Sequence, residues 1–196
     1  MAKQVQTIFS VGHSSRTLDD FLDLLTESNI ECVVDVRRLP GSRAFPHFNA
    51  DALAEALAKN DIDYWHLDAL CGRRSARELA GAQPETFWTN ASFARYAAYA
   101  RSQAFAFGLR ELVDRARQQR CAVMCSEAVW WRCHRRIIAD HLIALGVSVS
   151  HIMAPGKVDV ATQTRGAVIR DGEVIYPAPD VDHSTTQPVV TTKERS

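Results

Sequence analysis

Residues 121–145 read CAVMCSEAVWWRCHRRIIADHLIAL, which is a strand, a polar junction and a helix in succession. The first five residues form an apolar run, which predicts a buried strand. The last thirteen predict an amphipathic helix whose buried face carries Ile137, Ile138, His141, Leu142 and Leu145. Gly146 follows where a helix C-terminus favours glycine. A strand that leads into a helix is the repeating unit of α/β proteins.

The same alternation extends outward in both directions. Apolar runs predict further strands at residues 7–11, 32–36, 62–67 and 147–153. Helices are predicted at residues 17–25, 49–57, 92–100 and 109–116, with Thr17, Asn49 and Ser92 as N-caps. An Asp-Gly turn predicts a hairpin at residues 168–175. The expected fold is therefore α/β: a three-layer domain with a mostly parallel sheet flanked by helices, plus a small C-terminal hairpin.

Chain length and composition predict one domain. We expect residues 1–178 to form a single α/β domain in which residues 68–91 are a long loop insertion. Residues 179–196 are polar and rich in Thr and Pro, so they are expected to be disordered. Of the 196 residues, 46% are hydrophobic and 23% charged, which is ordinary for a globular protein.

Composition also restricts the partners. No apolar run approaches the roughly 18 residues of a membrane span, and residues 1–10 lack the pattern of a secretory signal. We therefore expect a cytoplasmic protein that does not bind a membrane. The net charge is zero, so no global field attracts nucleic acid. The five cysteines are an odd number in such a chain, which argues against a disulfide framework and leaves reactive or metal-binding thiols open.

The basic residues are 19 Arg and 4 Lys. Arginine suits phosphate or carboxylate, although a GC-rich genome produces the same bias, so position is more informative than number. Polar and mostly basic residues follow four of the predicted strands: Gly12, His13 and Ser14; Asp35, Arg37, Arg38 and Arg43; His66, Arg73 and Arg74; and Cys125, Glu127, Cys133, His134 and Arg135. The carboxyl ends of parallel strands share one edge of a sheet, so these residues predict one site, for an anion.

Each of these residues also has a structural interpretation. Asp35 ends an apolar strand, which is costly unless the carboxylate is used or paired with an arginine. His13 is suited either to proton exchange or to capping the next helix. Single arginines are often solvated loop residues.

Cys125, Glu127, Cys133 and His134 are the densest chemical cluster. A thiol at a helix N-terminus among arginines is expected to have a lowered pKa and to react as thiolate. The alternative is that both cysteines are small core residues. The phosphatase pattern, in which an Arg stands six positions after the Cys, is absent because position 131 is Trp. The spacing of Cys125 and Cys133 is a weak match to a structural zinc site. Trp130 and Trp131 are packing anchors or a stacking platform.

These motifs together resemble a known family. They are residues 11–14 (VGHS), 34–37 (VDVR), 40–43 (PGSR), 48–49 (FN), 66–67 (HL), 72–74 (GRR), 125–127 (CSE), 133–136 (CHRR) and the segment 171–177. The combination is similar to the domain-of-unknown-function family DUF488, over residues 7–177. Cys71 departs from the glycine expected before Gly72. The resemblance implies no activity, but it implies that the strand-end residues are the family signature.

Three functions remain open. The first is an enzyme that binds a phosphate-bearing, nucleotide or nucleic-acid-like substrate through the arginines. In that scheme Asp35 or Glu127 is the base or electrostatic stabiliser, and His13 or His134 exchanges protons. The second is a Cys-dependent thiol or sulfur-transfer enzyme with Cys125 or Cys133 as nucleophile. The third is a non-catalytic nucleic-acid-binding module. A metal held by some of the same residues is a further alternative, and the pattern identifies no cofactor.

Overall fold

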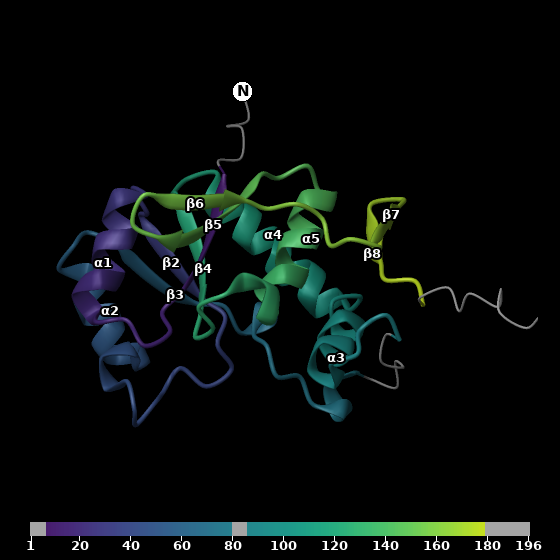
Figure 1. The fold of residues 1–196 in the computed structure, drawn as a ribbon, viewed down its shortest axis with the longest axis horizontal. Coiled ribbons are helices and arrows are strands. Elements are labelled where there is room, and N and C mark those ends of the chain that lie inside the picture. Colours follow the sequence, from purple (N-terminus) through teal and green to yellow (C-terminus); the bar gives the residue numbers. More distant parts are fainter. Residues whose placement is uncertain (1–6, 80–85, 179–196) are drawn as a thin grey trace, which may run out of the picture.

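The computed structural model describes residues 7–79 and 86–178 of the chain (Figure 1). The α-helices are α1 Leu18–Glu27, α2 Ala50–Ala58, α3 Ala91–Tyr99, α4 Gln103–Ala116 and α5 Arg135–Ala144. The strands are β1 Ile8–Gly12, β2 Cys32–Asp35, β3 Asp63–His66, β4 Cys121–Cys125, β5 Val149–Ala154, β6 Lys157–Val160, β7 Val168–Arg170 and β8 Glu173–Ile175.

Six strands form the main sheet, in the order β3-β2-β4-β1-β5-β6. The first five are parallel, and β6 pairs antiparallel with β5 at one edge. Gly12 of β1 lies opposite Cys125 of β4, and Asp35 of β2 lies opposite His66 of β3. The carboxyl ends of four parallel strands therefore lie side by side, because β4 sits between β1 and β2.

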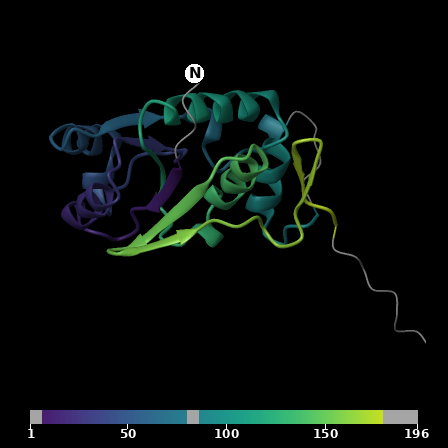
Figure 2. The ribbon, with the colours of Figure 1, turned by 90° about the horizontal axis from the view of Figure 1, so that it is seen from above.

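Helices cover both faces of this sheet (Figures 1 and 2). On one face Val33 packs with residues such as Phe21 of α1 and Leu53 of α2. On the other face Val34 packs with residues of α4 and α5, including Leu112 and Ile137. Because successive side chains of a strand point to opposite faces, burial on both sides explains the continuous apolar runs. The predicted three-layer α/β fold is confirmed.

The ends of the helices agree with the sequence in part. Thr17 caps α1, since its hydroxyl accepts a hydrogen bond from the Asp20 N–H at 3.1 Å. The prediction of Ser92 as a cap is wrong: the Asn90 side chain accepts from the N–H groups of Ser92 and Phe93, so α3 begins earlier. Asn49 stands at the start of α2, but its Oδ1 accepts from the Ser42 N–H at 2.6 Å and holds the preceding loop instead.

Strand β6 was not predicted from the sequence, because it is short and three of its four residues are exposed. The described part of the predicted loop 68–91 contains two short 3₁₀ helices, Asp68–Leu70 and Ala76–Leu79, and residues 80–85 lie outside the described chain. The tail predicted at 179–196 also lies outside it. Within the described residues no helix is long and apolar enough to cross a membrane.

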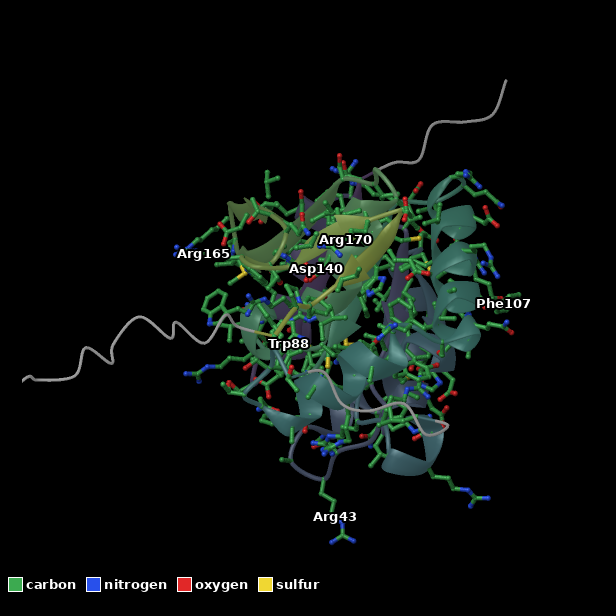
Figure 3. The ribbon with its side chains drawn as sticks, turned by 90° about the vertical axis from the view of Figure 1, so that its right-hand side faces the viewer. Arg43, Trp88, Phe107, Asp140, Arg165 and Arg170 are labelled. Carbon is green, nitrogen blue, oxygen red and sulfur yellow. The ribbon has the colours of Figure 1, made fainter. Side chains whose placement is uncertain are left out.

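The predicted C-terminal hairpin is β7–β8, and its segment docks on α5. Asp171 and Gly172 have φ of 51° and 80°, as a tight Asp-Gly turn requires. Beneath this segment lies Asp140 of α5 (Figure 3). Its carboxylate accepts hydrogen bonds from the Thr164 N–H at 2.7 Å and the Tyr176 hydroxyl at 2.8 Å. These contacts hold the helix whose N-terminus enters the site.

Candidate functional site

A pocket of about 910 Å³ opens at the carboxyl ends of the parallel strands. Residues of the loops that follow β1, β2, β3 and β4 line this pocket. The predicted site residues that line it are His13, Ser14, Arg37, Arg38, Arg73, Cys125, Glu127, Cys133 and His134. Gly12, Asp35, Arg43, His66, Arg74 and Arg135 are not among its lining residues.

Gly12 shapes the pocket through its backbone. A Cβ atom at this position would lie 1.8 Å from the backbone oxygen of Glu127, so no other residue fits without moving the chain. The following N–H groups of His13 and Ser14 donate to the backbone oxygens of Cys125 and Ser126, at 3.0 and 2.9 Å. The loop after β1 thus continues alongside the loop after β4, which brings the His13 and cysteine regions into one pocket.

Asp35 holds Arg37. The carboxylate is fully buried, and it accepts from the Arg37 Nε at 2.9 Å and from Nη2 at 2.6 Å. The Tyr64 hydroxyl donates to the same carboxylate at 2.7 Å. Burial alone would lower the pKa of Arg37, but the bonds and charge of Asp35 raise it above its ordinary value. With these partners, Asp35 is an anchor for the guanidinium rather than a free base.

His13 completes this support. Its Nδ1 lies 2.9 Å from the Ser14 oxygen, so Nδ1 carries the proton, and Nε2 accepts from the Arg37 Nη1 at 3.2 Å. The ring stacks on Phe48 with centroids 4.2 Å apart. Burial lowers the pKa of His13 to about 4, so the ring is neutral at pH 7. Arg37, which lines the pocket, is therefore held rigidly, and these bonds use one of the two N–H groups on each of Nη1 and Nη2.

The other predicted arginines differ in role. Arg74 is buried under the Tyr99 ring and pairs with Glu78 at 3.1 Å, so it holds the loop after β3. Arg38 lines the pocket and pairs with Asp68 and Glu78. Arg73 is exposed in the pocket wall, whereas Arg43 projects away from the body of the protein (Figure 3).

His66 supports the backbone, because its Nε2 lies 3.0 Å from the Arg37 oxygen.

Arg135 is the largest fully buried side chain in the part of the protein that the structure describes, and it is only 2% exposed. Its Nε donates to the Cys133 Sγ at 3.4 Å, its Nη1 to the Ser10 hydroxyl at 3.1 Å and its Nη2 to the Glu127 backbone oxygen. In the described chain no carboxylate lies within ion-pair distance of it. A buried guanidinium without an anion is costly. Among the described residues that Arg135 contacts, only the Cys133 thiol can become an anion.

The two cysteines of the pocket are electrostatically different. Burial raises the pKa of Cys133, but a hydrogen bond from the Cys125 thiol, the charge of Arg135 and the Arg135 backbone N–H outweigh burial and lower it to about 6. Cys125 donates to Cys133 and is itself buried, which raises its pKa to about 12. Cys133 is therefore the more acidic thiol of the pair.

His134 completes the cluster. Its Nδ1 lies 3.6 Å from the Cys133 Sγ, and one ligating atom from each of Cys125, Cys133 and His134 lies within 4.8 Å of the others. Such a trio can bind a soft metal ion. The guanidinium of Arg135 against Cys133, with no balancing carboxylate in the described residues, disfavours a second cation here. Gly72 permits this packing, because a Cβ there would lie 2.7 Å from the His134 Nδ1.

Several lining and supporting residues escaped the sequence prediction. Phe45, Phe93, Tyr96 and Arg132 line the pocket, and Ser10 and Tyr64 support Arg135 and Asp35. Phe93 and Tyr96 lie on α3, Phe45 lies in the loop after β2, and Ser10 and Tyr64 occupy interior positions of β1 and β3, so none of these five stands at a strand end. The Trp130 ring stacks on His151 with centroids 4.4 Å apart and serves packing, while Trp131 is 46% exposed.

The chain matches the family model described as "Domain of unknown function DUF488" over residues 17–142. That span is more than half of the chain, so this protein belongs to the DUF488 family, and the resemblance seen in its motifs is confirmed. The match includes Arg37, Cys125 and Cys133. No curated protein and no solved structure matches the chain.

Proposed function

We propose that this protein is an enzyme in which the Cys133 thiolate attacks an electrophilic atom of an anionic substrate. The observation that carries this proposal is Arg135, a buried guanidinium whose only potential anion in the described chain is the Cys133 sulfur. Thiolates are the nucleophilic form of cysteine, and a neighbouring cation with a helix N-terminus stabilises them. Among the alternatives posed by the sequence, this arrangement favours thiol chemistry.

The anionic part of the substrate binds at Arg37 in this proposal. A guanidinium held on one side by Asp35 and His13 presents its remaining N–H groups in a fixed direction, which suits a phosphate or carboxylate. The pocket volume of about 910 Å³ accommodates a molecule of nucleotide size. Phe45 and Phe93 offer apolar contact in the same wall.

Acid–base chemistry has fewer candidates than the sequence offered. The polar atoms of Asp35 and His13 are engaged with Arg37 and its neighbours, so both are positioning residues in this scheme. His134 beside the thiolate and the exposed Glu127 remain for proton transfer. The zero net charge and the use of arginines inside a pocket favour a small anionic molecule over nucleic acid. A reducing compartment such as the cytoplasm would keep the thiols reduced.

Alkylation by iodoacetamide as a function of pH tests the proposal. Rapid modification of one cysteine with an inflection near pH 6 is expected, because Cys133 is then about 90% thiolate at pH 7, against about 3% for an ordinary cysteine. The rapid phase should vanish in Cys133→Ser and persist in Cys71→Ser, whose buried thiol has a pKa raised to about 12. An inflection near pH 8.5, or a stoichiometric metal ion that protects both pocket cysteines, would contradict the proposal.

A further inference from the structure

Two thiols lie together in the pocket. Cys125 ends β4, and Cys133 lies two residues before the first residue of α5. Both line the pocket, although they are only 7% and 3% exposed. Their sulfur atoms lie within 4.8 Å of each other. Cys32 and Cys121 also pair across neighbouring strands, but at the opposite end of the sheet and outside the pocket.

We propose that Cys125 and Cys133 form a dithiol–disulfide couple whose substrate is an anionic disulfide bound at Arg37. The inference rests on the proposed function, since it takes Cys133 as the nucleophile. When a substrate sulfur is bound to Cys133, the neighbouring Cys125 can attack the Cys133 sulfur and release it, because thiolates attack disulfide sulfur readily.

In the first step the Cys133 thiolate attacks one sulfur of the disulfide R–S–S–R. A new bond forms between that sulfur and Cys133, the S–S bond of the substrate breaks, and RS⁻ leaves and takes a proton from solvent. The product is a mixed disulfide between Cys133 and one R–S group. Arg37 holds the anionic group of the substrate, and Arg135 loses its neighbouring negative charge.

In the second step Cys125 gives up its proton and attacks the Cys133 sulfur. The Cys125–Cys133 disulfide forms, and the second RS⁻ leaves and is protonated. The sum is one disulfide and two protein thiols converted to two RSH and one protein disulfide, so two electrons pass from the protein to the substrate. Small-molecule thiols return the protein to its reduced form.

The charges set the order of these steps. The pKa of Cys125 is raised first by its hydrogen bond to Cys133, then by burial, then by the negative charge of Cys133, whereas His134 lowers it. Once Cys133 carries an R–S group, the thiolate and its hydrogen bond are gone, while Arg135 and His134 remain. Cys125 therefore becomes more acidic only after the first step, which makes it a resolving thiol and not a competing nucleophile.

Oxidised glutathione, a disulfide with several carboxylates, is the probe. Reduced protein is mixed with it and quenched in acid, and the intact mass is measured over time. Wild type should lose two hydrogens and release two equivalents of glutathione. Cys125→Ser should keep one glutathionyl group, Cys133→Ser should not react rapidly, and the matched control Cys71→Ser should behave as wild type.

A neutral disulfide, bis(2-hydroxyethyl) disulfide, tests the choice of substrate. Wild type should react at least tenfold faster with oxidised glutathione, and Arg37→Ala should lose most of that preference. Equal rates with both probes would overturn the anionic assignment. A stable glutathionyl adduct on wild type would overturn the couple while leaving Cys133 as nucleophile, whereas an ordinary alkylation pKa with no reaction would overturn the proposed function itself.

Discussion

Replacing Arg135 with Met removes the charge beside Cys133 and keeps a long buried side chain. The guanidinium lies 3.4 Å from the Cys133 Sγ and is 2% exposed, so solvent screens it little. We expect the pKa of Cys133 to rise in Arg135→Met. The same change removes a buried charge that lacks a carboxylate partner in the described chain, so the loss of charge by itself need not destabilise the fold.

The size of the effect follows from the pKa of Cys133. Its fall from 9.0 to about 6 corresponds to about 4 kcal/mol in favour of the thiolate. Two causes contribute most to the lowered pKa of Cys133: the hydrogen bond from Cys125 and, second, the charge of Arg135. The substitution removes only the charge of Arg135. We therefore expect the pKa to rise by about one to two units, which lowers the thiolate at pH 7 from about 90% to between about 10 and 50%.

The assay is the rate of iodoacetamide alkylation between pH 4.5 and 10. At pH 7 the rate in Arg135→Met should fall about two- to tenfold, and above pH 9 it should approach that of wild type. Arg135→Lys keeps a charge and should shift the inflection less, and Arg110→Met, at an exposed position of α4, is the matched control. An unchanged inflection in Arg135→Met that unfolds cooperatively would refute the role of Arg135.

The depressed pKa of Cys133 makes its contribution to stability full above about pH 9 and lost as the pH falls through about 6. Denaturant unfolding of wild type and Cys133→Ser should therefore converge toward pH 5, and parallel curves would contradict this. Burial lowers the pKa values of His13, His141 and His151 from 6.5 to about 4. Between pH 6.5 and 4 the unfolded chain therefore binds more protons than the folded chain. The free energy of unfolding should fall as the pH is lowered through this range, by up to about 1.4 kcal/mol per pH unit for each histidine. His141→Gln should reduce this pH dependence. Gly72→Ala places a Cβ 2.7 Å from the His134 Nδ1, so thermal unfolding should show a loss of about 1–3 kcal/mol together with slower alkylation of Cys133; an unaltered protein would show that His134 moves freely. Arg37→Ala should weaken calorimetrically measured binding of a phosphate-bearing ligand about ten- to a hundredfold, and unchanged affinity would remove Arg37 from the site.

Much of the fold follows from local pattern. Apolar runs and helical periodicity locate five parallel strands and the helices between them. The signal is strongest for β1, β2 and β4, because these central strands are buried at every position and burial on both faces favours apolar residues. Prediction from local pattern is wrong where a strand is exposed, or where two neighbouring polar residues can both cap the same helix. Strand β6 has little apolar pattern, and Asn90 rather than Ser92 caps α3 because its side chain reaches two free N–H groups.

The candidate site divides in the same way. The sequence alone places polar residues after four strands and a cysteine before a basic helix, since the order of residues along each strand determines what stands at its end. Only the tertiary structure shows that Asp35 and His13 hold Arg37, that Arg74 is buried as loop support, and that Arg135 faces the Cys133 sulfur.

The physical reason is the order of the strands. Placing β4 between β1 and β2 sets residues about a hundred positions apart against one another, and burial then decides which polar groups keep their charge. Strand order depends on packing between distant segments, which no local pattern encodes. The sequence therefore determines which chemical groups reach this edge of the sheet, and the folded structure decides which of them are anchors and which are left to react.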